Sequence, residues 1–303
     1  MAQSTAGELP RSFTMSNGKV VPSVGFGTYG LTDAEKHPEV IYRAISESGY
    51  RFLDCASKYA NEEFVGQAVT RAISEGVVSR DDLFIVSKIW PSEFHDPEAA
   101  LRTSLAKLQT DHVDCYLIHW PAGFFDENPA NRVPIHVLWR QLEALVDQGL
   151  TRSIGVSNFN LQLTADLLCY ARIKPVFNEI ELNPTCTQPE LLRFLKANDI
   201  LAIAYTPVCR LGQVENEALW ADERLQAICE RHGKSKAQVM INWAVARGTI
   251  PIPRSGTPAH IAENIDIFGF ALSAEEVSTI DGMDKELRLC DKRPFTGDFY
   301  FFA

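Results

Sequence analysis

Four polar side chains near the ends of apolar segments have the types needed for proton-transfer chemistry. Asp54 closes an apolar run that begins at Tyr50, and Tyr59 follows five residues later. Lys88 and His119 end two further apolar runs. If these runs are parallel strands joined by helical crossovers, their carboxyl ends lie on one face, where the acid, the phenol, the ammonium and the imidazole converge. That face is the predicted active site.

The elements that would position these groups alternate along the chain. Apolar segments predict strands at 24–27, 50–53, 83–87, 113–118, 152–156, 175–180, 201–204 and 249–252. Helical patterns occupy 38–48, 62–75, 97–108, 135–148, 161–171, 189–198 and 235–247. Eight strand-helix units of roughly 30 residues, with strands apolar throughout, favour an all-parallel sheet. Closing such units predicts a single (β/α)8 TIM barrel.

Shorter signals complete this prediction. Residues 13–21 have the pattern of a β-hairpin with an Asn17-Gly18 turn, which would plug the amino-terminal end of the barrel. Two capping boxes begin at Ser235 and Ser273, and two extra helices are expected at the C-terminus. The alternative, a doubly wound open sheet, would need a glycine-rich phosphate turn, and the early glycines lack GxGxxG spacing.

These elements divide the chain into three parts. We assign residues 1–12 to a mobile tail and residues 13–303 to the barrel. Within the barrel, residues 284–303 are expected to line the substrate pocket.

The composition and net charge of the chain limit the classes of molecule that it is expected to bind. The chain has 303 residues, 46% of them apolar and 22% charged, and a net charge of −10 at pH 7. This acidic balance argues against nucleic-acid or membrane-surface binding and favours a small-molecule partner. Seven scattered cysteines without a CxxC pair indicate a reduced compartment rather than disulfides or a metal site. The N-terminus lacks the apolar core of a signal peptide, so we expect a cytoplasmic protein.

Longer motifs connect these elements to a known family. They are Gly49-Tyr50-Arg51, Leu53-Asp54-Cys55-Ala56, Tyr59, Glu62, Gly66, Ser87-Lys88-Ile89-Trp90, Leu117-Ile118-His119-Trp120-Pro121, Gly155-Val156-Ser157-Asn158-Phe159, Ile252-Pro253-Arg254-Ser255 and Ala262-Glu263-Asn264. With these motifs the chain resembles the aldo-keto reductase family from about Phe13 to the C-terminus. The resemblance implies a single barrel that reduces aldehydes or ketones to alcohols with a nicotinamide cofactor, usually NADPH. The acidic surface, with no long apolar patch in the sequence, favours a monomer. The family's four catalytic positions fall on Asp54, Tyr59, Lys88 and His119.

The resemblance gives each of these four residues a role. Tyr59 would be the general acid that protonates the substrate oxygen. Lys88 would stabilise the phenolate and make Tyr59 a stronger acid, Asp54 would fix Lys88, and a neutral His119 would orient the substrate oxygen. Each residue also has a structural alternative: an Asp54–Lys88 ion pair, a satisfied core histidine, or an aromatic residue in a loop. The joint placement at adjacent strand ends favours catalysis.

The cofactor's phosphate site follows partly from local sequence. After the last strand, Arg254 precedes Thr257, which suits an N-cap, and Pro258, which suits the first helical position. A helix starting there would offer free backbone N–H groups to an anion. The alternative is an ordinary basic loop and cap.

By resemblance, other residues line the rest of the cofactor. Ser157 and Asn158 would hold the nicotinamide carboxamide, Tyr205 would stack on the ring, Thr206 and Arg210 would contact the pyrophosphate, and Glu263 and Asn264 would bind the adenine. The remaining expected cofactor contacts are Gly27, Thr28, Asp54, Glu179, Pro207, Val208, Ile252, Pro253, Arg254, Ser255, Gly256, Thr257 and His260.

Departures from the family pattern bear on the cofactor and the substrate. Glu179 stands where most relatives carry glutamine, and an ionised carboxylate cannot donate to the carboxamide oxygen. His260 stands where relatives place an arginine that contacts the 2′-phosphate, so NADPH is expected first and NADH use stays open. Tyr29 replaces a common tryptophan at the pocket mouth. The other expected pocket residues are Tyr59, Trp90, His119, Trp120, Phe124, Phe125 and the segment 293–300.

Two other functions remain open from the sequence alone. The same barrel without turnover would be a nicotinamide-binding redox sensor or structural protein, because fold does not fix function. A barrel hydrolase would instead use Asp54 and Glu181 as paired carboxylates, although Lys88 and Tyr59 would then have no role.

Overall fold

The computed structural model describes residues 8–209, 217–290 and 302. An antiparallel hairpin, β1 (Ser12–Thr14) and β2 (Val20–Pro22), precedes an eight-stranded parallel sheet. The strands of the sheet are β3 (Phe26–Gly27), β4 (Phe52–Asp54), β5 (Phe84–Ile89), β6 (Cys115–Ile118), β7 (Ile154–Ser157), β8 (Phe177–Glu181), β9 (Leu201–Tyr205) and β10 (Thr249–Pro251), paired in chain order.

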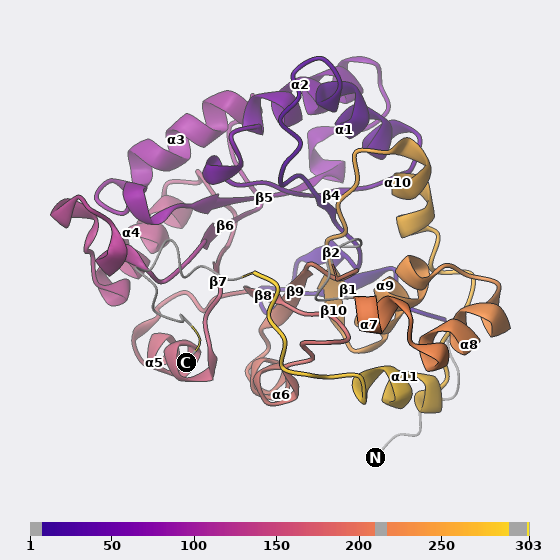
Figure 1. Cartoon of the computed structure of the whole chain (residues 1–303). Coiled ribbons are helices and arrows are strands. Elements are labelled where there is room, and N and C mark those ends of the chain that lie inside the picture. Colours follow the sequence, from indigo (N-terminus) through magenta and orange to yellow (C-terminus); the bar gives the residue numbers. More distant parts are fainter. Residues whose placement is uncertain (1–7, 210–216, 291–301, 303) are drawn as a thin grey trace.

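Backbone hydrogen bonds close this sheet. Gly25 N–H donates to the Pro251 carbonyl at 3.0 Å, and Gly27 N–H donates to the Pro253 carbonyl at 3.1 Å. The two glycines are needed here because a Cβ at either position would lie 2.8 Å from an atom of Ile252. The structure therefore confirms the (β/α)8 barrel, and Figure 1 shows its helices arranged around the strands.

The helices lie close to their predicted positions. They are α1 (His37–Ser46), α2 (Glu62–Ser74), α3 (Pro97–Leu108), α4 (Ile135–Asp147), α5 (Leu161–Tyr170), α6 (Pro189–Ala197), α7 (Glu217–Trp220), α8 (Glu223–His232), α9 (Lys236–Ala246), α10 (Pro258–Ile265) and α11 (Ala274–Asp281). Both capping boxes form, at Ser235 and Ser273. The sequence analysis missed α7 and α8, although Asp222 caps α8 and Gly233 ends it with φ 60°.

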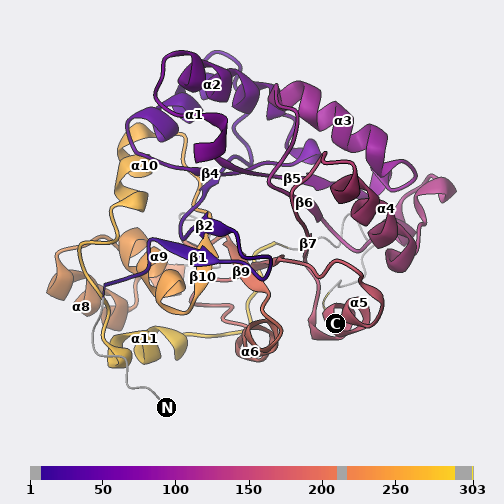
Figure 2. The ribbon, with the colours of Figure 1, turned by 180° about the vertical axis from the view of Figure 1, so that it is seen from behind.

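The barrel interior follows the two-residue period of its strands. Phe52, Phe84 and Phe177 project inward and pack together, with Phe84 edge-on to both of the others. Met15 and Val21 of the hairpin segment join the same cluster. The hairpin thus closes the amino-terminal end of the barrel as predicted, and Figure 2 shows it lying across that end.

Residues 8–12 do not belong to the mobile tail that was predicted for residues 1–12. Leu9 is buried in the main core, and β1 already begins at Ser12. The extended chain at this point exchanges backbone hydrogen bonds with the hairpin region, since Ser23 N–H donates to the Arg11 carbonyl at 3.0 Å. Residues 8–12 are therefore part of the packed structure.

The packing of α2 against α3 leads to a stability prediction. A Cβ at Gly66 would lie 2.3 Å from the Lys107 carbonyl oxygen and 2.8 Å from the Leu108 carbonyl carbon. Gly66→Ala must therefore separate two helices, and we expect it to lower the free energy of unfolding by about 1–3 kcal/mol in urea titrations. Gln67→Ala on the exposed side of the same helix is the control, with a change within about 0.5 kcal/mol. Equal stability of the two variants would contradict this packing.

Candidate active site

The four predicted catalytic residues come from three neighbouring strands and the short 3-10 turn Ser57–Tyr59. Asp54 is the last residue of β4, and His119 directly follows β6. Lys88 lies inside β5, which continues to Ile89, and not after the strand as expected. Because inward positions alternate, Phe84, Val86 and Lys88 share the face of β5 that points into the barrel.

The Lys88 ammonium is the centre of this cluster. It is 0% exposed, and it donates to the Asp54 carboxylate, to the Cys55 carbonyl at 3.0 Å and to the Tyr59 hydroxyl at 3.1 Å. An ammonium has three N–H donors, so all of them are used. A second carboxylate oxygen, Oε2 of Glu179, lies 3.4 Å from Nζ. The structure thus brings Asp54, Tyr59 and Lys88 together and adds Glu179 to them.

Burial and charge shift the pKa values of all these groups. Burial raises the pKa of Tyr59 well above its usual value, and the Lys88 charge opposes this without reversing it. Lys88 therefore acts in the predicted direction, since its charge and hydrogen bond lower the pKa of Tyr59, but burial has the larger effect. Burial alone would lower the pKa of Lys88, but the charges around it raise that pKa well above its usual value. Tyr59 is consequently protonated and Lys88 charged at neutral pH.

Aromatic rings surround the Tyr59 hydroxyl. The rings of His119 and Tyr29 stand edge-on to Tyr59, with centroid distances of 5.5 and 5.2 Å. Trp90 supports His119 from the other side at 5.0 Å. These contacts hold the phenol and the imidazole at one wall of the pocket, where a carbonyl oxygen can reach both.

A single pocket of about 740 Å³ connects this cluster to the loop after β10, within the usual size range of small-molecule sites. Its lining includes nineteen of the predicted residues. They are Gly27, Tyr29, Asp54, Tyr59, His119, Trp120, Ser157, Asn158, Glu179, Tyr205, Thr206, Pro207, Val208, Ile252, Arg254, Ser255, His260, Glu263 and Asn264.

The amide predicted to hold a carboxamide is already held by other groups. Asn158 has φ 63° and donates to the His119 carbonyl at 2.9 Å and to the Ser157 hydroxyl at 3.0 Å. Its Oδ1 accepts from the Tyr205 hydroxyl at 2.7 Å. Ser157 in turn donates to the backbone carbonyl of Glu179 at 2.9 Å. This chain of hydrogen bonds makes one side of the pocket rigid and polar.

At the other end of the pocket, Arg254 is not extended into open space. Its guanidinium donates to the carbonyls of Tyr29 at 2.9 Å and Gly30 at 3.2 Å, so it connects the loop after β3 to the loop after β10. Thr257 occupies the N-cap of α10 as predicted, but its side chain accepts no hydrogen bond there. The Ser255 hydroxyl accepts from Thr257 N–H at 3.0 Å instead.

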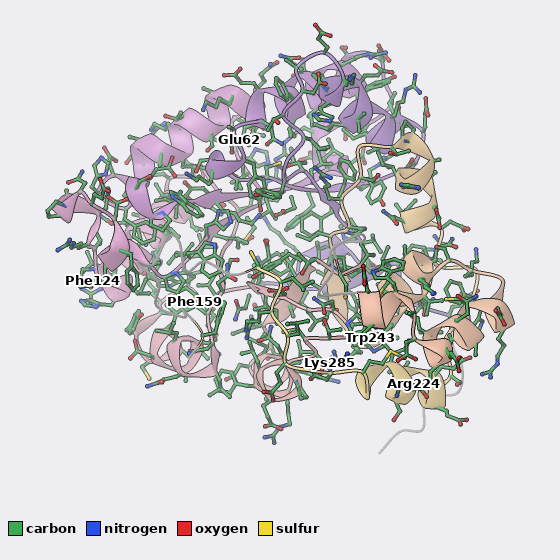
Figure 3. The ribbon with its side chains drawn as sticks, in the orientation of Figure 1. Glu62, Phe124, Phe159, Arg224, Trp243 and Lys285 are labelled. Carbon is green, nitrogen blue, oxygen red and sulfur yellow. The ribbon has the colours of Figure 1, made fainter. Side chains whose placement is uncertain are left out.

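Several predicted residues do not line the pocket among the described residues. Thr28 is buried behind Asp54, whose carbonyl accepts its hydroxyl at 2.8 Å. Phe124 is 71% exposed and lies at the edge of the molecule in Figure 3. The others outside the lining are Lys88, Trp90, Phe125, Pro253, Gly256 and Thr257. Arg210 and the segment 293–300 lie outside the described residues.

The lining also contains residues that the sequence analysis missed: Trp220, Ser235, Lys236, Ala237 and Cys290. Trp220 ends α7, and its carbonyl accepts from the Lys236 ammonium at the start of α9. For Trp220 the missing signal was α7 itself, whereas Ser235, Lys236 and Ala237 belong to the predicted start of α9.

The segment after α11 is held over the pocket by Glu181. The Glu181 carboxylate accepts from the backbone N–H groups of Leu289 at 2.7 Å and Cys290 at 3.0 Å. Farther along, Phe302 packs on Trp120 with a centroid distance of 5.7 Å. Figure 1 shows residues 282–290 running from α11 toward β8. Since Asp54 is bonded to Lys88 and Glu181 to this segment, the two carboxylates do not form a hydrolase pair.

No group of three or more His, Cys, Asp or Glu side chains suited to a metal ion occurs in the described ranges. In the same ranges, none of the helices combines the length and apolar character needed to cross a membrane.

Comparisons with known proteins identify the family of the chain. The sequence model described as "Aldo/keto reductase family" matches residues 23–285. The NADH-dependent D-xylose reductase of Candida parapsilosis is 38% identical, covering 97% of this chain and 98% of that protein. Aldose reductase B of Dictyostelium discoideum is 37% identical, covering 91% and 93%. A crystal structure of a Bombyx mori aldo-keto reductase in complex with NADP superposes with a TM-score of 0.86 at 35% identity, covering 95% and 97%.

Proposed function

The chain belongs to the aldo/keto reductase family, and on this premise we propose that it reduces the carbonyl group of small aldehydes or ketones with a nicotinamide nucleotide. The observation that carries the proposal is the hydrogen bond of 3.1 Å from buried Lys88 to Tyr59, at the wall of the 740 Å³ pocket. A protonated phenol beside a fixed cation is suited to donate a proton to an oxygen that becomes negative.

The residues fit a dinucleotide because the pocket joins two different sites. One end has Tyr59 and His119, and the other has Arg254, Ser255 and the start of α10, which is suited to a phosphate group. The bound nucleotide would supply the hydride. Ser157, Asn158 and Tyr205 would hold its nicotinamide end, while His260, Glu263 and Asn264 would hold its adenosine end.

Residues of the chain would then transfer a proton to the substrate oxygen. Tyr59 gives its proton to the substrate oxygen, and the Lys88 ammonium, 3.1 Å from the phenol oxygen, stabilises the phenolate that remains. Asp54 holds Lys88 in place through a direct hydrogen bond. His119, edge-on to Tyr59, orients the same substrate oxygen. The proton returns to Tyr59 from solvent before the next turnover.

The direct test measures the loss of reduced-nicotinamide absorbance. NADPH and NADH are offered separately against an aromatic aldehyde, an aldose such as D-xylose, and a quinone. We expect turnover of at least one carbonyl, with sugars included because relatives carry the names D-xylose reductase and aldose reductase. Tight NADPH binding without turnover of any of them would favour a sensing or structural protein instead.

The cofactor preference leads to a prediction at His260. A guanidinium binds a phosphate bidentately and an imidazole does not, so His260→Arg should raise the ratio of kcat/KM with NADPH to that with NADH. Gain of one charged hydrogen bond predicts an increase of about 10- to 100-fold. Ala259→Arg is the matched control, because it adds the same charge at the neighbouring exposed position. An equal increase in both variants would show a general charge effect and not a specific contact.

The proposal includes a monomeric, cytoplasmic enzyme that binds a small-molecule substrate beside the nucleotide, and neither nucleic acid nor a membrane. The net charge of −10 supports the absence of nucleic-acid and membrane partners, because phosphate backbones and anionic lipids would be repelled. Sedimentation velocity at micromolar concentration checks the monomer.

A further inference from the structure

Glu179 is a buried acid that the proposed reduction does not need. It lies in the middle of β8, is 2% exposed and lines the pocket beside Tyr59 and Asp54. A carboxylate in such a place is costly unless it has a cation or hydrogen-bond donors of its own. The surroundings of Glu179 decide which protonation state it has.

The nearest cation, Lys88, acts on Glu179 through its charge. Lys88 lies 3.4 Å from Oε2, but its three N–H groups point to Asp54, Cys55 and Tyr59. Oε2 accordingly has no hydrogen-bond partner among the described residues. With both Asp54 and Glu179 ionised, the buried cluster would hold two negative charges and one positive charge. The protonated form of Glu179 removes the excess charge and leaves the Asp54–Lys88 pair intact.

The other groups that face Glu179 do not change this balance. Burial raises the pKa values of the Cys115 thiol and of the Tyr59 and Tyr205 phenols, which stay neutral near pH 7. Burial and the Asp54 charge raise the pKa of Glu179 to about 8, against the opposing effect of Lys88. The titratable and charged groups around it are Asp54 on β4, Lys88 on β5, Cys115 on β6, Tyr59 on the 3-10 turn, Tyr205 on β9 and His119 after β6.

The charge of a bound nucleotide differs between its two redox forms. The oxidised nicotinamide ring carries a positive charge that the reduced ring lacks, and a ring positioned to react beside Tyr59 must lie close to Glu179. A buried positive charge favours the ionised form of a neighbouring carboxyl group. A neutral ring favours the protonated form, whose O–H can donate to the carboxamide oxygen as an amide would.

We propose that Glu179 makes binding of the oxidised cofactor proton-linked: it is protonated in the free and reduced-cofactor forms, and it releases its proton to solvent when the oxidised cofactor binds. This inference rests on the proposed function, because it requires a nicotinamide nucleotide in the pocket. Glu179 is a positioning residue here, since it acts through the ring and the carboxamide and not on the substrate.

The test measures binding and not turnover. Dissociation constants for NADP⁺ and NADPH are determined from the quenching of tryptophan fluorescence between pH 6 and 9. Because binding of NADP⁺ releases a proton while Glu179 is protonated, the ratio Kd(NADP⁺)/Kd(NADPH) should fall about tenfold per pH unit up to about pH 8 and then level off. The 2′-phosphate is common to both nucleotides and cancels in the ratio.

Glu179→Gln should make this ratio independent of pH, because an amide of the same shape has no proton to release. Glu62→Gln is the matched control: Glu62 is also a buried acid with a raised pKa, but it does not line the pocket, so its replacement should leave the pH dependence unchanged. Titration calorimetry in two buffers of different ionisation enthalpy gives a second measurement. It should find close to one more proton released per NADP⁺ than per NADPH at pH 7 in the unaltered protein.

The possible results distinguish failure of the inference about Glu179 from failure of the proposed function. A flat ratio in the unaltered protein, or a pH dependence that survives Glu179→Gln but disappears in Tyr59→Phe, would overturn the role of Glu179 and leave the proposed function intact. Failure of both nucleotides to bind would overturn the proposed function and this inference together.

Discussion

Tyr59→Phe is expected to lower kcat/KM for carbonyl reduction by about 10²- to 10⁴-fold while NADPH still binds. The variant removes one oxygen atom, the acceptor of the 3.1 Å hydrogen bond from Lys88. Phenylalanine preserves the edge-on contacts of the ring with His119 and Tyr29, so the shape of the pocket should not change. Steady-state kinetics with each carbonyl substrate, together with fluorescence titration of NADPH, measure the two quantities separately.

A suitable control makes the same chemical change on the surface. The Tyr42 hydroxyl bonds to Glu75 between α1 and α2, far from the pocket lining, and Tyr42→Phe should leave kcat/KM unchanged. If Tyr59→Phe keeps more than about a tenth of the activity, another group supplies the proton. The imidazole of His119, whose ring lies 5.5 Å from that of Tyr59, would then be the candidate.

The face of the barrel that carries the proposed active site was predictable from the sequence because its information is local. An apolar strand that ends in a polar residue specifies both a buried segment and a group at its carboxyl end, and this occurs at Asp54 and His119. The parallel order of the strands then determines that these ends are neighbours. The hairpin plug and the two capping boxes were predictable for the same reason, since each is encoded within a few residues.

The features that were not predicted depend on contacts between distant parts of the chain. Arg254 meets the Tyr29 carbonyl more than two hundred positions away, and Glu181 meets the backbone of Leu289. Phe124 follows His119 by five residues, yet its loop turns it outward to 71% exposure. Local sequence gives the identity of such residues but not the direction in which a loop carries them.

The protonation states of the buried cluster around Lys88 also could not be predicted from sequence motifs. The sequence shows Asp54, Lys88 and Glu179 as separate strand residues, and only the structure shows that one ammonium serves two carboxyl groups. Burial decides the outcome, because it raises the pKa of Tyr59 where the ion next to it would lower it. In the proposed mechanism, the Lys88 charge would therefore act mainly on the phenolate formed during the reaction.

Lys88→Met should reduce kcat/KM at least as strongly as Tyr59→Phe and should also destabilise the fold. Methionine retains the length of the side chain but leaves Asp54 and Glu179, which are 1% and 2% exposed, without a cation. Removing one partner of a buried ion pair costs about 3–5 kcal/mol. Without the cation, the folded-state pKa values of both carboxyl groups rise further above their unfolded values. Because Glu179 is already largely protonated at neutral pH, the deficit there comes mainly from Asp54. It should be largest near pH 8 and should shrink as the pH falls and Asp54 becomes protonated in the folded protein.

Urea titrations at pH 5 and pH 8 measure this deficit, and a second variant separates charge from catalysis. Lys88→Met combined with Asp54→Asn and Glu179→Gln removes both carboxyl charges, so it should recover most of the stability at pH 8 and lose the pH dependence. It should not recover activity, because nothing then stabilises the Tyr59 phenolate. Recovery of activity in the triple variant would mean that Lys88 has only a structural role. Equal stability of Lys88→Met and the unaltered protein at pH 8 would mean that solvent, and not Lys88, balances the two carboxyl groups.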